Sequence, residues 1–248
     1  MQTARYPRRS PLQQGAALAE SVAGLALVLT LGVLIVETAQ WQMARQLTTL
    51  ALLEAARAGA TEQAQPQVIA RAFERALIPL LASGRGTAAQ AGARVQATLA
   101  ARSLRAGLPA WRIHIDSPRA AHVDDFATAA GGPRGGAADA GGPALSHGYQ
   151  FEQHQAHRRR WPAGRGPRSG QDIFDANRLA LRLRYLHQPL TPLLGGLLRA
   201  IGWATDGERG QAMRQGLMPI HGELAVTMQS GARRWPPWHG NGGAVTGE

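Results

Sequence analysis

The sequence contains no cysteine, which excludes a disulfide framework and any zinc or redox site built on thiolates. It also contains no lysine, so all 27 of its basic residues are arginine. Aromatic residues make up only 5% of the chain, whereas 44% of its 248 residues are hydrophobic. That hydrophobic content is sufficient for a folded core, so the length predicts one ordinary domain with appendages or two small domains.

Acidic residues are few relative to arginine, which gives a formal net charge of +11. Clustered arginine neutralises the phosphates of nucleic acids or the head groups of anionic lipids. Arginine without lysine, together with abundant Ala, Gly and Pro, is also typical of a GC-rich genome. Part of the charge therefore reflects residue usage, and on charge alone we do not expect nucleic acid as a partner.

Motifs typical of enzymes are missing as well. The chain has no Gly-x-Ser-x-Gly elbow, no P-loop, no His-Glu-x-x-His pair and no cysteine nucleophile. Its paired acids, Asp124 with Asp125 and Asp172 with Asp175, lie in or beside expected loops, without a setting for acid/base chemistry. We therefore expect no enzyme activity, no cofactor and no small-molecule substrate.

No charged residue lies between Ser21 and Val36, a stretch rich in Leu, Val and Ala. As a helix these sixteen residues extend about 24 Å, and apolar neighbours on both sides bring the length to that of a bilayer core, about 30 Å. Three arginines precede the stretch among the first nine residues, without an acid. The positive-inside rule then places residues 1–15 in the cytoplasm as a basic leader and the remainder across the membrane.

A cleaved secretory signal peptide shares the basic start and the apolar stretch, and it is the alternative interpretation. Its cleavage site would follow the apolar run, but the sequence after Glu37 continues as a helical pattern, with Met43, Leu47 and Leu50 at spacings of three and four. We therefore predict one helix from about Gln13 to Thr61, about 70 Å long, with half of it in lipid.

Glu20 is an acid at the start of the apolar run, and it follows Gly15 by five positions. A carboxylate in hydrocarbon costs about 2.5–3.5 kcal/mol on insertion scales and normally has a partner. This order resembles the prepilin peptidase signal of type IV pilins and pseudopilins, which consists of a basic leader, a glycine, four residues, a glutamate and an apolar helix. The resemblance implies cleavage between Gly15 and Ala16, with the new amine of Ala16 neutralising Glu20. Glu20 could instead snorkel at the helix start, where the dipole favours negative charge.

Residues 13–61 also resemble the N-terminal module of TadE/TadG-like proteins, minor subunits of the tight-adherence (Tad) pilus system. The residues that carry this resemblance are Gly15, Glu20, Glu37, Gln46 and the run from Ala55 to Ala60. It implies a single-pass protein of the bacterial inner membrane whose helix 16–61 packs among the helices of other subunits, with Glu20 and Glu37 setting the pairing. Its partners would be the prepilin peptidase, other pilins and the pilus assembly platform.

Residues 62–117 and 173–232 are expected to form an extracytoplasmic domain in the periplasm or outside the cell. Pro66 opens a second helix, and Thr87 caps a third helix that ends at Gly107. Three further segments alternate apolar and polar residues and are expected to be strands: 111–117, 178–186 and 223–229. The predicted fold class is α+β, a long N-terminal transmembrane helix that continues into a small domain of helices packed on an antiparallel sheet.

Residues 118–172 and 233–248 are rich in Gly, Pro and Arg without any period, so we expect a flexible insertion and a disordered tail. The insertion contains a basic cluster with an aromatic neighbour: Arg158, Arg159, Arg160 and Trp161. This combination favours an anionic partner. The alternative function is therefore a membrane-anchored binding module, an adhesin or a binder of nucleic acid or another anionic polymer. A solvated charge run is the simpler interpretation.

Two more features leave alternatives open. His147, His154 and His157 lie near one another in the insertion but lack an acid at helical spacing, so we expect solvated loop histidines and no metal. Residues 189–203 are the second most apolar stretch, although Pro, Gly and Arg199 make it too short and interrupted to span a membrane. We expect it to pack on the sheet, with a partner-facing patch as the alternative.

Overall fold

The computed structural model describes residues 11–82, 86–128, 144–235 and 243–246, with side chains from residue 18 onward. Most of the expected leader, the middle of the expected insertion and most of the expected tail lie outside the described residues. The chain divides into two compact units, Met1–Gln42 and Met43–Glu248, which are described separately.

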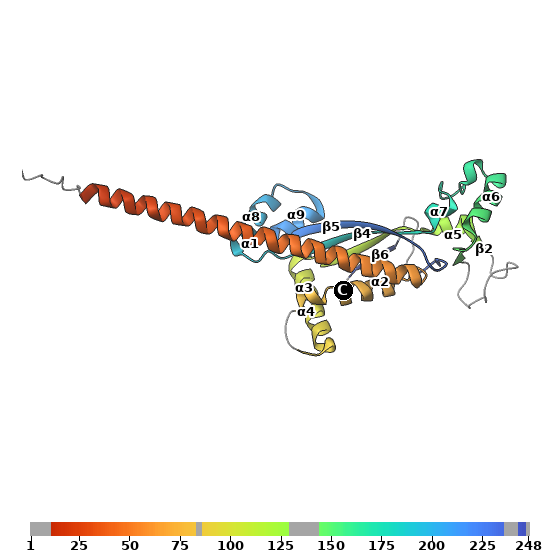
Figure 1. Ribbon diagram of the computed structural model, residues 1–248, viewed down its shortest axis with the longest axis horizontal. Helices are drawn as coiled ribbons and strands as arrows, with labels where there is room; N and C mark the ends of the chain where they lie inside the picture. Colours follow the sequence, from red (N-terminus) through yellow and green to blue (C-terminus); the bar gives the residue numbers. More distant parts are fainter. Residues whose placement is uncertain (1–10, 83–85, 129–143, 236–242, 247–248) are drawn as a thin grey trace, which may run out of the picture. The chain divides into compact units, whose positions relative to one another are not determined.

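Helix α1, Pro11–Thr61, begins in the first unit and ends in the second (Figure 1). In the first unit, every residue from 18 to 36 is exposed. The most apolar window of the helix has a mean hydropathy of 2.2 and is only 6% buried. A core helix of a soluble protein would be covered on at least one side. Within the described chain, α1 is the one helix that is long and apolar enough to cross a membrane.

The second unit is built on an antiparallel sheet with the strand order β5, β4, β1, β6 (Figure 1). Its strands are β1, Trp111–Ser117; β4, Arg178–His187; β5, Met218–Thr227; and β6, Gly243–Thr246. Trp111 lies opposite Tyr185, and both are fully buried. The next pair, Arg112 and Arg184, points to the other side because side chains alternate along a strand. The mixed helix-and-sheet fold and all three predicted strands are confirmed, although β5 begins five residues before the predicted segment 223–229 and ends two residues earlier. The sheet has one apolar and one charged face.

The second half of α1 and helix α2, Pro66–Ala76, cover the apolar face. The inner side of α1 contains the large side chain of Leu52, which is 0% exposed, and otherwise mainly small residues with exposed fractions of 0–2%: Ala44, Thr48, Ala51, Ala55, Ala56 and Ala60. A Cβ on Gly59 would lie 2.7 Å from Ile69 Cγ1 and 2.9 Å from Leu179 Cδ2, so a larger residue does not fit there. The small residues of the run 55–60 therefore let α1 approach both α2 and the sheet.

Helix α4, Ala88–Ala106, follows the short helix α3, Ile78–Leu81. Thr87 Oγ1 accepts a hydrogen bond from the Gln90 N–H at 3.3 Å, and Gln90 Oε1 accepts one from the Thr87 N–H at 3.0 Å. The helix ends at Gly107, whose φ of 62° is the left-handed conformation that glycine adopts without strain. The predicted cap and stop of this helix are confirmed.

A helical hairpin connects β4 to β5 and consists of α8, Pro192–Gly202, and α9, Gly207–Arg214. The hairpin is closed by glycine backbone, because a Cβ on Gly210 would lie 1.7 Å from Thr205 O and one on Gly202 would lie 2.5 Å from Arg214 N. α8 packs on α9, which contacts β5. The apolar stretch 189–203 was expected to pack on the sheet, but its helix packs mainly on α9, which lies between it and β5, and its other side is exposed.

Between β1 and β4 the chain forms a lobe, where we expected a flexible insertion. Its elements are α5, Ala120–Phe126; β2, Ala127–Thr128; β3, Ala144–Leu145; α6, Gln150–Arg160; the 3-10 turn Pro162–Gly164; and α7, Ile173–Ala176. The ring of Phe126, which is 2% exposed, lies 5.2 Å from that of His157 and 5.7 Å from that of Trp161. These contacts join short pieces that have no recognisable period. We call residues 118–128 and 144–177 the aromatic lobe.

The tail, where we expected disorder, is also structured in its described part. Trp235 Nε1 donates a hydrogen bond to Gln63 O at 2.9 Å. Strand β6 pairs with β1 from Arg112 to Ile115. A strand of only four residues, Gly-Ala-Val-Thr, has too little alternation to be recognised in the sequence, and its pairing is supplied by the open edge of β1.

Candidate functional site

The two acids of α1 that the resemblance assigns to helix pairing have different surroundings. Glu20 is exposed, and it makes no hydrogen bond or ion pair with any described residue. Glu37 is only 4% exposed and already interacts within its own chain. Of the two carboxylates, Glu20 is therefore the accessible one.

The predicted processing bond between Gly15 and Ala16 lies inside α1, a little more than one turn from its first residue, Pro11. Helix ends unwind at the lowest cost in free energy, so a bond in this position becomes accessible without disturbing the remainder of the helix. Glu20 follows Ala16 by four residues, which places both on the same side of the helix.

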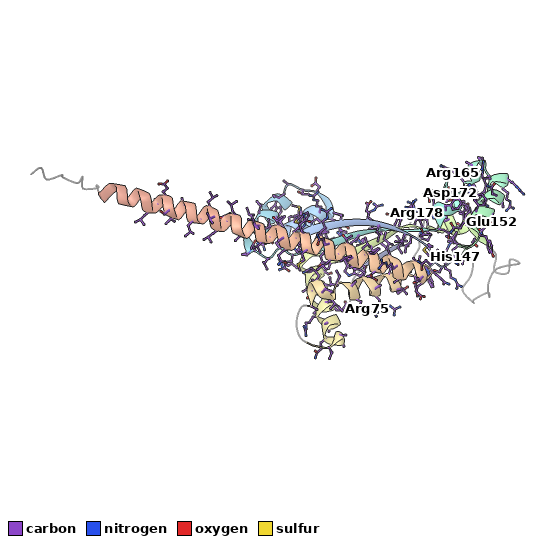
Figure 2. All side chains as sticks on the ribbon, viewed as in Figure 1. Arg75, His147, Glu152, Arg165, Asp172 and Arg178 are labelled. Carbon is purple, nitrogen blue, oxygen red and sulfur yellow. The ribbon has the colours of Figure 1, made fainter. Side chains whose placement is uncertain are left out.

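In the aromatic lobe, Arg158, Arg159 and Arg160 form the last turn of α6, and all three are exposed. None of them forms an ion pair with an acid in the described part of the chain. The C-terminal end of a helix favours cations, which explains why three arginines are tolerated side by side. Arg165 lies in the same lobe and is labelled in Figure 2 together with Glu152 and Asp172. The lobe therefore presents positive charge that its own acids do not neutralise.

Trp161 adds to this cluster less than the sequence suggests. Its ring stacks on His157 with a centroid distance of 4.8 Å and an interplanar angle of 3°. One side of the indole is thus occupied inside the lobe. Burial lowers the pKa of His157, and the nearby Arg160 and His154 lower it further, so the stacked imidazole is neutral at neutral pH.

The acids of the lobe hold its loops together. Asp125 Oδ2 accepts a hydrogen bond from the Ser169 N–H at 2.7 Å, Asp124 pairs with Arg168 at 3.0 Å, and Asp172 Oδ1 accepts from the Asp175 N–H at 2.9 Å. Among the described residues no group of three or more His, Asp or Glu side chains is arranged to hold a metal ion. These acids and histidines therefore contribute to the structure of the lobe.

The charged face of the sheet was not singled out in the sequence, although Arg182 and Arg184 alternate with apolar residues in β4 and Arg112 lies among apolar residues in β1. Glu208 of α9 lies 3.0 Å from Arg112 and 2.6 Å from Arg184. Asp116 lies 2.7 Å from Arg182, whose side chain is more exposed than those of Arg112 and Arg184. Burial lowers the pKa of the Arg184 guanidinium. Because these arginines have acidic partners, this face offers less free positive charge than the lobe does.

Comparison with known proteins gives no assignment. No protein-family model matches the chain, and no curated protein or solved structure matches it. A functional interpretation therefore depends on the motif around Glu20 and on the surfaces described above.

Proposed function

We propose that this chain is a minor pilin-like subunit, or a membrane-anchored assembly component, of a Tad-type pilus, and that it acts by helix packing. The observation that carries the proposal is Glu20, which is exposed, lacks a partner among the described residues and lies at the start of the fully exposed stretch 18–36. In hydrocarbon an unpaired carboxylate costs about 2.5–3.5 kcal/mol, so a counter-charge from a partner would stabilise the inserted helix.

Processing would supply that counter-charge. Water attacks the carbonyl carbon of Gly15, the C–N bond to Ala16 breaks, and the products are a carboxylate on Gly15 and an ammonium group on Ala16. Glu20 then lies four residues, or about 6 Å along the helix axis, from a positive charge. The ammonium group pairs with Glu20 of its own helix or of a neighbouring one, and in the second case it fixes the stagger between subunits.

This proposal places residues 1–15 in the cytoplasm and the second unit in the periplasm or outside the cell. It is supported by the three arginines before the apolar stretch and by the exposure of that stretch. The prepilin peptidase, the assembly platform in the inner membrane and other pilins are the proposed partners.

The first experiment is N-terminal sequencing of the protein extracted from membranes. A chain that starts at Ala16 is the expected result, whereas a chain that retains Met1 would contradict processing and leave only an anchored domain.

The second experiment replaces Glu20 by glutamine and measures how much of the protein enters pili. Loss of the ion pair should lower incorporation at least about tenfold, since 1.4 kcal/mol already corresponds to a factor of ten. Glu54→Gln is the matched control, because Glu54 is an exposed acid of the same helix whose partner, Arg57, lies in the same chain at 3.1 Å. Normal pili with Glu20→Gln would contradict the proposal.

A second candidate function is supported by Arg158, Arg159 and Arg160, which are exposed, form no ion pair with an acid in the described ranges and suit an anionic polymer. Under this candidate, replacing all three by glutamine abolishes salt-sensitive retention of duplex DNA or polyphosphate and leaves pilus assembly intact. The control is Arg182→Gln, which removes an exposed arginine that already pairs with Asp116. Unchanged retention after the triple substitution would dismiss the binding function.

A further inference from the structure

Helix α8 has an exposed apolar side. Its buried residues are Gly195, Leu198 and Gly202. The large apolar residues exposed on α8 and its flanks are Leu190 (65%), Leu193 (62%), Leu197 (55%), Ile201 (45%) and Trp203 (80%). Three of them recur every four residues and so lie along one side of the helix. Soluble monomers rarely expose so contiguous an apolar surface unless it meets another surface.

The register of α1 on the sheet shows which end of the second unit carries this surface. A Cβ on Gly222 of β5 would lie 3.7 Å from Leu52 Cδ2, and the Gln229 N–H donates to Ala60 O at 3.0 Å. Helix α1 and strand β5 therefore run in the same direction. From Leu52 back to Met43 the helix covers about 13 Å, and from Gly222 back to the start of β5 the strand also covers about 13 Å. The first residue of the unit is thus level with the start of β5.

Helix α8 lies at the same end. A Cβ on Gly216, two residues before β5, would lie only 3.2 Å from Gly195 O of α8. Met43 follows the last residue of the apolar stretch, Val36, by seven residues, or about 10 Å of helix, and follows Trp41 by two. An interfacial tryptophan at position 41 would mark the edge of the bilayer. The end of the second unit that carries α8 is therefore also the end at which the chain joins the anchor.

The geometry points to α8 as an interfacial helix that lies on the bilayer with its exposed apolar side in the lipid. The inference rests on the membrane anchoring in the proposed function. The charge of the helix favours anionic lipid, because Arg199 is its only charged residue. The guanidinium carbon of Arg214 lies 5.8 Å from the ring centroid of Trp203, and an indole beside a cation is suited to the head-group region. Such helices bury their apolar side about 5–10 Å into the boundary between head groups and acyl chains.

This contact has a consequence for assembly. A single transmembrane helix leaves the attached domain free to rotate and tilt at the membrane surface. A second attachment through Leu193, Leu197 and Ile201 restricts that motion, so that the domain is presented to other subunits in a limited set of orientations.

The absence of native cysteine permits a direct test in the full-length protein. Single cysteines replace Leu197 in α8, Leu29 in the apolar stretch and Phe151 in the aromatic lobe, all of which are at least half exposed (55%, 61% and 64%). Each carries an environment-sensitive fluorophore. The labelled proteins are reconstituted in vesicles of phosphatidylethanolamine and phosphatidylglycerol, with or without lipids that bear a quencher on the acyl chain. Leu193→Cys provides an independent probe of the same side of α8.

We expect the quenching lipids to remove most of the emission at positions 197, 193 and 29 and to leave position 151 unchanged. Quenching at position 29 alone would overturn the inference and leave the anchor intact. Emission at position 197 that resists quenching and depends on the ratio of protein to lipid would assign the surface to a second copy of the chain. Absence of quenching at positions 29 and 197 would overturn the anchor and the inference together.

Discussion

The connections at the two ends of the sheet differ in how they pack and in which side chains they expose. Where β4 ends and β5 begins, the α8–α9 hairpin closes on glycine backbone and exposes apolar side chains. Where β1 ends and β4 begins, the aromatic lobe closes on packed rings and exposes arginine. The first end suits an apolar neighbour and the second an anionic one. The difference shows that one small unit can carry surfaces of different chemistry at the two ends of the same sheet.

The largest expected effect is on the ring packing of the lobe. Phe126→Ala removes a fully enclosed ring and should destabilise the lobe by about 3–5 kcal/mol, which is typical of such truncations. Hydrogen exchange should show lost protection in 120–126 and 150–160 and unchanged protection in 192–214. Phe174→Ala is the control, because that ring is 39% exposed and contacts only one other ring, that of His154, among the described residues. Equal losses at both ends of the sheet would contradict the separation between them.

The next largest effect is expected on the stability of the α8–α9 hairpin, at the other end of the sheet. Gly210→Ala forces a methyl group against Thr205 O, and overpacking of this kind costs about 1–3 kcal/mol. Gly196→Ala is the matched control, since a Cβ there meets nothing within 4 Å. That control should stabilise the helix by about 0.5–1 kcal/mol. Thermal unfolding measures both variants, and a Gly210→Ala protein as stable as the parent would refute the glycine closure.

A smaller effect follows from acidification. The pKa values of His122 and His157 are lowered mainly by burial, and His122 Nδ1 accepts a hydrogen bond from the Arg119 N–H at 3.0 Å, which requires the neutral ring. Below the ordinary value of 6.5, the unfolded lobe therefore binds more protons than the folded lobe. Stability is fully present above 6.5 and is lost as the pH falls through the folded-state pKa.

The hairpin, residues 192–214, contains no histidine and provides the internal comparison. Hydrogen exchange, corrected for its intrinsic pH dependence, should show the lobe opening more readily in mild acid while the hairpin is unchanged. If the amide protection of the lobe does not fall in mild acid, protonation of His122 and His157 is not coupled to the folding of the lobe.

The smallest effect is on stability when the surface charge of the lobe is changed. Arg159→Gln should change the free energy of unfolding by no more than about 0.5 kcal/mol, since the side chain is exposed and pairs with no acid that the structure describes. Chemical denaturation measures this change. A large loss would show that the arginine cluster supports the lobe and is not an open binding surface.

Local signals made much of this fold predictable. Alternating residues predicted β1 and β4, and Thr87 with Gly107 predicted both ends of α4. The lobe was not predictable in the same way, because Phe126 meets His157 and Trp161 only after the chain has folded, and its helices are too short for a period to be recognised. Strand β6 was likewise not predictable, because it forms by pairing with the edge of β1, which is distant in the sequence.

The candidate sites also divide into those that the sequence predicts and those that only the structure shows. Glu20 follows from the one-dimensional order of leader, glycine and apolar helix, and a sequence is sufficient to single it out. The exposed side of α8 is different, because leucines occur on both sides of this helix and only the structure separates buried Leu198 from exposed Leu197. Pairing of Arg112 and Arg184 with Glu208 also depends on tertiary placement.

The close fit of α1 on the sheet has a mechanical consequence. Helix α1 and strand β5 run in the same direction, and the helix is held along its length by small residues and at its end by the Gln229 hydrogen bond to Ala60 O. Tension applied along α1 through Met43 is therefore shared by all of these contacts at once, in shear. A helix loaded in this way resists extraction better than one whose contacts peel away in succession.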